Sequence, residues 1–155
     1  MASPDVLTIE STDLYDRLAR WLEDRIDDAF PTLGGVYFEN QRIDRPTFNA
    51  SDTVASSWVL IEVRETISRQ MDIGTSNPWF QADGNLHIHC RTPLDIGSGQ
   101  AREIADVVSN ILRRSEHSIG VSGISLRAPS LRTTAMPEWF QVMVTCPFQA
   151  RARKY

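Results

Sequence analysis

The chain has 155 residues and a net charge of −4; 41% of its residues are hydrophobic and 23% are charged. This length fits one domain, residues 1–155, and the composition excludes a disordered or fibrous chain. No run approaches the roughly 18 apolar residues of a membrane span, and the small negative charge does not by itself indicate a nucleic-acid-binding protein.

The charge is distributed unevenly along the chain. Residues 1–78 contain 14 acidic and 7 basic side chains, whereas residues 79–155 contain 6 and 9, which gives −7 and +3. Such asymmetry is typical either of separate solvated faces or of head-to-tail association, in which one face of a subunit meets a different face of the next.

The two cysteines, Cys90 and Cys146, lie in apolar, strand-like segments without a CxxC motif. Their spacing argues against a zinc site and favours buried free thiols. The first ten residues lack the basic and apolar regions of a signal peptide. We therefore expect a protein of the reducing cytoplasm, with a flexible N-terminal segment at residues 1–10.

The first predicted element is a helix over residues 12–30. Aliphatic residues recur every four positions along it and form one apolar face, and Pro31 ends it. A short strand is expected at residues 36–40, followed by a polar loop over residues 41–56. Apolar and charged residues interleave over residues 57–69, which predicts a second strand with one face in water.

Residues 71–83 are expected to connect this strand to the next one and contain two adjacent aromatic residues, Trp79 and Phe80. Strict alternation over residues 86–92 then predicts a strand with two different faces. One face carries Leu86, Ile88 and Cys90, and the other carries His87, His89 and Arg91.

A second helix is predicted at about residues 100–115, with small and aliphatic residues on one face. Two further strands are expected at residues 119–127 and 139–148, with a loop between them, and residues 149–155 form a basic C-terminal tail. Because strands occur in neighbouring runs, this order favours an α+β fold. We expect a mainly antiparallel (mixed) sheet of four to five strands with both helices packed on one face.

His87 and His89 point the same way on their predicted strand, which makes them the first candidates for metal binding. A zinc site needs three or four protein ligands, and the remaining histidine, His117, lies beyond the second helix. We therefore interpret the pair as solvent-facing and expect no metal and no cofactor.

The segment from Asp95 to Gly99 precedes the second helix, where backbone N–H groups could hold an anion. It lacks the lysine of a P-loop and the third glycine of a dinucleotide-binding motif, so we interpret it as a turn that caps the helix. No nucleophile motif occurs, and the carboxylates concentrate on the polar side of the first helix. The sequence predicts no catalytic residues and no enzyme.

Three stretches of the chain form a recognisable pattern. They are the helix ending at Pro31 with the segment Val36-Tyr-Phe-Glu-Asn40; the segments Trp58-Val-Leu-Ile-Glu-Val, Gly84-Asn-Leu-His-Ile-His and Thr92 to Ala101; and the strand Trp139 to Pro147. Over about residues 12 to 148, their order resembles the tail terminator-like (tail completion) proteins of long-tailed phages and prophages.

The resemblance implies a structural virion protein that forms a ring, commonly a hexamer, on the last disc of the tail tube. The ring would stop tube growth and join the tail to the head connector, and genomic DNA would only pass through its lumen. The family has no catalytic residues, and its interfaces lie on loops and sheet edges. The positions expected at interfaces are Arg42, Arg45, Trp79, Phe80, Arg151, Arg153 and Lys154.

Two alternatives stay open. The chain could be another neck or tail-tube subunit of the virion, which shares the assembly chemistry but not the stopping function. It could also be a small cytoplasmic enzyme with its site on the open sheet face around His87, His89 and Arg91.

Overall fold

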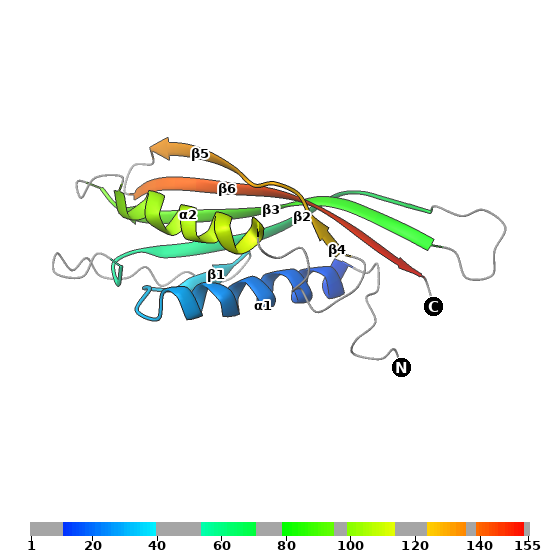
Figure 1. The fold of residues 1–155 in the computed structure, drawn as a ribbon, viewed down its shortest axis with the longest axis horizontal. Coiled ribbons are helices and arrows are strands. Elements are labelled where there is room, and N and C mark those ends of the chain that lie inside the picture. The colour runs from blue at the N-terminus through cyan, green and yellow to red at the C-terminus, as the bar shows by residue number, and fades with distance from the viewer. Residues whose placement is uncertain are drawn as a thin grey trace.

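A computed structural model describes residues 11–39, 54–70, 79–94, 99–113, 124–135 and 139–153. These residues form two helices and a six-stranded mixed sheet (Figure 1). The elements in chain order are α1 (Ser11–Ala29), β1 (Val36–Phe38), β2 (Trp58–Gln70), β3 (Trp79–Pro93), α2 (Gly99–Arg113), β4 (Ile124–Leu126), β5 (Ser130–Ala135) and β6 (Trp139–Arg153). The predicted α+β class with a mixed sheet and two helices is confirmed.

Several sequence predictions fall outside the described residues. They concern the N-terminal segment 1–10, the polar loop up to residue 53, and the interface positions Arg42, Arg45 and Lys154.

The apolar faces of both helices are confirmed. In α1, Leu18, Leu22 and Ile26 are fully buried, and α2 buries its own face of Ala101, Ile104, Ala105, Val108 and Leu112. Both faces share one core with alternate residues of the three long strands, among them Val59, Ile61, Leu86, Ile88, Cys90, Val142, Val144 and Cys146. Each large aliphatic side chain buried there contributes roughly 1.5–3 kcal/mol.

Neither of the two described helices is long and apolar enough to cross a membrane.

The sheet has the order β1-β2-β3-β6-β4, and β5 also pairs with β6. The short strand β1 is parallel to β2, whereas every other pair is antiparallel. The predicted two-faced character of β3 is confirmed: Leu86, Ile88 and Cys90 are buried in the core. We call the opposite side, which carries His87 and His89, the outer face.

The two longest strands extend further than the sequence predicted. β3 begins at Trp79, inside the expected connection 71–83, and β6 continues to Arg153, inside the expected tail 149–155. Apart from Trp79 and Phe80, these residues are polar or small, so they resemble turn or tail segments in the sequence. In the structure they lie in one ladder, in which β3 has β2 on one side and β6 on the other.

The number of strands is also corrected, from four or five to six among the described residues. β5 occupies a segment that was expected to be a loop. Its residues 130–134 are all exposed, so the segment has no alternation of apolar and polar positions that would predict a strand. Of the strand expected at residues 119–127, β4 accounts for Ile124–Leu126, and residues 119–123 lie outside the described residues.

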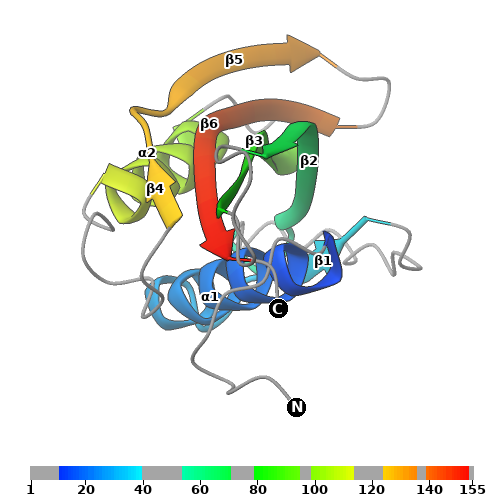
Figure 2. The same ribbon diagram turned by 90° about the vertical axis from the view of Figure 1, so that its right-hand side faces the viewer.

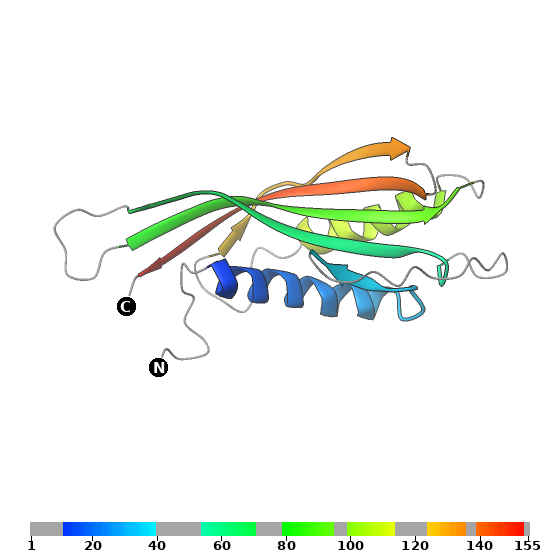
Figure 3. The same ribbon diagram turned by 180° about the vertical axis from the view of Figure 1, so that it is seen from behind.

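One end of the sheet extends beyond both helices (Figures 1 and 3). We call this part the strand arm: residues 64–70 of β2, 79–85 of β3 and 147–153 of β6. The remainder of the molecule, where α1 and α2 cover the sheet, is the body. Viewed along its length, the molecule has β5 at one margin and α1 at the opposite margin (Figure 2).

Candidate assembly surfaces

The strand arm brings together residues that the sequence predicted at interfaces. In the β3–β6 register, Trp79 lies opposite Arg153, Phe80 lies beside it, and Arg151 is opposite Gln81, although Arg151 and Gln81 are 70 residues apart in the chain. Trp79 is 40% exposed. Two predictions made from separate parts of the sequence therefore fall at one place, the end of the arm.

A ladder of polar side chains crosses the arm on the outer face. Arg151 Nε donates to Gln81 Oε1 at 3.1 Å, and Gln81 Nε2 donates to both carboxylate oxygens of Asp83 at 3.2 Å. Gln149 Nε2 donates to Asp83 Oδ1 at 3.3 Å, and an Arg69 guanidinium nitrogen is 3.9 Å from Asp83 Oδ2. These bonds join all three strands and fix the arginine at the arm end.

The arm joins the body at Gly84. A Cβ at this position would collide with the backbone oxygen of Arg64 and would lie 2.6 Å from Cζ of Phe148. The β2–β3 register shifts between Glu65 and Ile67, directly beside this glycine. Glycine therefore permits a close approach of β2, and the Phe148 ring covers the space that a side chain would fill.

On the body, His87 and His89 share one face of β3, the outer face, as predicted. The expectation that the pair faces solvent is wrong for His89, whose side chain is 13% exposed. His89 Nε2 is 3.3 Å from Glu62 Oε1, and His87 Nδ1 is 3.2 Å from Thr145 Oγ1. Burial lowers the pKa of both imidazoles; Arg64 lowers that of His87 further, while Glu62 opposes the shift in both. Both rings are therefore neutral near pH 7. Within the described ranges, no three His, Cys, Asp or Glu side chains are grouped so that they could hold a metal ion.

A cluster of aromatic side chains, which the sequence did not predict, packs on the outer face beside these histidines. Trp58 is fully buried, and its ring meets those of Tyr37 and Trp139 edge-on, with centroids 5.8 and 5.7 Å away. The Arg91 guanidinium lies 4.8 Å from the Trp58 centroid, and its Nε donates to Gln141 Oε1 at 2.7 Å. Arg91 is thus held by packing within the body.

Comparison with known proteins identifies a fold and no family. No family model matches the chain. No curated protein matches it either. One solved structure, which has no functional name, superposes with a TM-score of 0.57 at 19% sequence identity, covering 90% of this chain and 91% of that one. At this identity the likeness establishes a shared fold alone.

Both cysteines are buried and free, as the sequence predicted. Burial raises the pKa of the Cys90 thiol to about 12 and that of Cys146 to about 11, and Cys146 Sγ donates to the backbone oxygen of Arg127 at 3.1 Å. Because the thiolate is the reactive form, neither residue is suited to nucleophilic chemistry.

The polar side of α1 ends in a cluster of acids, Glu23, Asp24, Asp27 and Asp28, and its last turn has no basic residue. Burial, followed by the neighbouring carboxylates, raises the pKa of Glu23 and Asp27. Carboxylates here face the negative pole of the helix dipole. These carboxylates contribute to the negative charge of the N-terminal half of the chain. Their position at the C-terminal end of α1 destabilises the helix rather than stabilising it.

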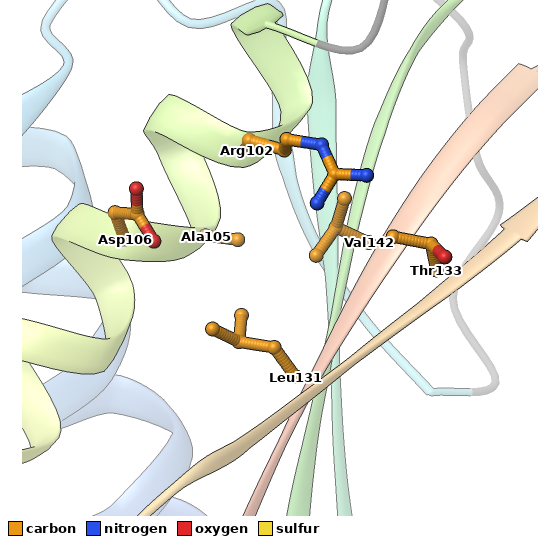
Figure 4. Close-up of a pocket in the computed structure, with 6 residues that line it drawn as sticks. All are labelled: Arg102, Ala105, Asp106, Leu131, Thr133 and Val142. Atoms are coloured by element: carbon orange, nitrogen blue, oxygen red, sulfur yellow. The ribbon is translucent and has the colours of Figure 1, made fainter.

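An open pocket of about 270 Å³ lies between α2 and β5 (Figure 4). Its lining consists of Arg102, Ala105 and Asp106 from α2, Leu131 and Thr133 from β5, and Val142 from β6. Leu131 is 47% exposed, although its side chain points toward the helix side. Helix α2 therefore does not cover the sheet as far as β5, and an apolar side chain remains in contact with solvent there.

Proposed function

We propose that this chain is a tail terminator subunit of a long-tailed phage or prophage. In this role it forms a ring, commonly a hexamer, that caps the tail tube, stops its growth and joins it to the head–tail connector. Its partners are other copies of itself, the tail tube protein and the connector, while genomic DNA only passes through the lumen. The site of action is the virion, after assembly in the host cytoplasm.

The observation that supports this proposal most directly is the strand arm. It extends beyond the helices and has at its end an exposed tryptophan, Trp79, and an arginine, Arg151, whose side chain the polar ladder holds. Tryptophan and arginine are the residues most enriched among the energetic anchors of protein interfaces. An enzyme needs a concave site, whereas a projecting arm with such residues suits contact with another protein.

The asymmetry of the molecule also favours a ring. Its arm end and its body end are different surfaces, and a contact between unlike surfaces is heterologous. Such contacts close into a ring when the rotation between subunits permits it. The opposite charges of the two halves of the chain suit the same head-to-tail arrangement.

The test is the native mass of the purified chain by light scattering, with negative-stain images of the same peak. We expect closed rings of about six copies, and we expect the chain to arrest the growth of tubes when it is added to polymerising tail tube protein. Open tubes formed by this chain alone would favour the tail-tube alternative. A chain that neither closes into rings nor changes tube growth would contradict the proposal.

The enzyme alternative has a separate test. In the double variant His87→Ala, His89→Ala, we expect bound metal, as measured by elemental analysis, and assembly to be the same as in the parent protein. Loss of a bound metal or of a measurable activity in this variant would support an enzyme with its site on the outer face.

A further inference from the structure

We infer that neighbouring copies of the chain join edge to edge, with β5 of one copy pairing with residues 64–69 of β2 in the next. This inference rests on the proposed ring, and it names the surfaces through which the ring closes. It makes the sheet continuous across the subunit boundary.

The first edge is β5. This strand pairs with β6 along its whole length, from Ser130 opposite Thr145 to Ala135 opposite Phe140. No described strand pairs with its other side. An unpaired edge presents a row of N–H and C=O groups to solvent, and this row is a template for pairing with a strand of another chain. Within β5 there is no proline, and Arg132 is the one charged residue, so the usual means of blocking an edge are sparse.

The second edge is the arm segment of β2. β1 pairs only with residues 59–61, and Glu39 then ends this pairing: its backbone N–H donates to Ile61 O at 3.2 Å, and its Oε1 accepts from Val63 N at 3.2 Å. Beyond Val63, no described strand lies on this side of β2. Among the described residues, 64–69 therefore form a second open edge on the opposite side of the same sheet.

The directions of the strands make these two edges compatible. The strands β2, β3, β6 and β5 are neighbours in that order, and each pair is antiparallel. Because these four strands alternate in direction, β2 and β5 run in opposite directions. A second copy placed beside the first in the same orientation therefore has its β2 antiparallel to β5 of the first copy. The helices of both copies then lie on the same side of the joined sheet. Copies related by rotation in a ring keep this common orientation.

The pairing also requires the second copy to be displaced along the strands. Through β6 and β3, the β5 strand is level with residues 58–62 of β2, of which β1 already pairs 59–61, so only a copy displaced along the strand direction brings its 64–69 segment beside β5. The arm holds that segment at the end of the sheet that extends past the helices, where a second copy can reach it (Figure 3). A strand added to β5 would also cover Leu131 and the pocket beside it (Figure 4), as strand addition commonly combines backbone hydrogen bonds with side-chain pockets.

Two proline variants, Arg132→Pro and Thr133→Pro, test the inference. Successive N–H groups of a strand point to opposite sides, so one proline removes an N–H that faces β6 and the other removes an N–H at the open edge. Thermal unfolding identifies the open-edge variant, because it unfolds as the parent does. We expect this variant to remain a monomer in light scattering under conditions in which the parent forms rings. If it assembles like the parent, the inference is overturned.

Hydrogen exchange on the parent provides a test that needs no variant. In rings, compared with dilute monomer, we expect amides in both 64–69 and 130–135 to exchange on the order of tenfold more slowly. Protection of 130–135 alone would indicate symmetric β5–β5 pairing and would overturn the inference. Rings without protection of either edge would also overturn it but leave the proposed function standing. A parent that never assembles, even on tail tubes, would overturn both.

Discussion

The body and the strand arm are built from the same three strands but by different means. In the body, two helices bury large aliphatic side chains such as Ile61 and Ile88 against the sheet. In the arm, the core side carries Ala82, Phe148 and Ala150, which belong to the same core, and the outer side carries the polar ladder. Most of the large buried aliphatic side chains therefore lie in the body, whereas an exposed side chain of the arm such as Trp79 can serve contacts with other molecules.

The sharpest test of this difference is Ile88→Ala in the body. Because Ile88 is fully buried in the shared core, we expect the free energy of unfolding to fall by about 2–5 kcal/mol. Denaturant unfolding measures the change. The matched control is Leu131→Ala at the exposed sheet edge, where we expect a change within about 0.5 kcal/mol. Equal losses in the two variants would contradict the larger contribution of the buried aliphatic side chains.

The junction of the two regions is tested by Gly84→Ala. The added methyl group would meet the backbone oxygen of Arg64, which cannot move without disturbing the bulge, so we expect a loss of about 1–3 kcal/mol. Gly99→Ala is the control because its Cβ would meet nothing within 4 Å. Hydrogen exchange should show faster opening of the arm than of the body in the first variant, and a uniform effect would count against a local junction.

The outer face of the body should show a pH dependence. Burial holds the pKa of His89 below its ordinary 6.5, so the unfolded chain binds a proton at a higher pH than the native chain. The free energy of unfolding should therefore decrease as the pH falls through and below 6.5. Unfolding in denaturant at about pH 7.5 and about pH 5.5 measures this, and His89→Gln should reduce the difference between the two. An unchanged difference would exclude His89 as its cause.

The smallest effect on stability is expected for Trp79→Ala at the arm end. Because this side chain is 40% exposed, we expect the free energy of unfolding to fall by about 1 kcal/mol, which is less than for Ile88→Ala. We expect ring formation, measured by light scattering, to weaken all the same. A variant that assembles normally would remove Trp79 from the proposed interface while leaving the fold unaffected.

Elements with a strong period in the sequence were predicted correctly. The helical spacing of Leu18, Leu22 and Ile26 and the alternation of β3 from Leu86 onward each reflect burial on one face, which a sequence records directly. The placement of Trp79 and Arg151 at the same end of the sheet was not predictable, because the register between β3 and β6 depends on residues far apart in the chain.

The elements that the sequence did not predict have no periodic pattern of apolar residues. β5 is exposed from Ser130 to Thr134, so these residues show no periodic pattern of burial, and it is a strand because β6 lies beside it. In β3, the polar Gln81 and Asp83 beside Gly84 resemble a turn, yet all three lie in the ladder between two strands. The bond between the Arg91 and Gln141 side chains likewise appears only once the strands are paired.

The burial of both cysteines has a practical consequence for following the arm in solution. The chain contains two cysteines, and in the native state neither Cys90 nor Cys146 presents an accessible thiolate at neutral pH. A single cysteine introduced at an exposed position such as Ser125, which lies opposite Gln149 of the arm, would react first with a maleimide dye. The natural chain is thus already suited to site-specific fluorescent labelling, and the core thiols need not be replaced.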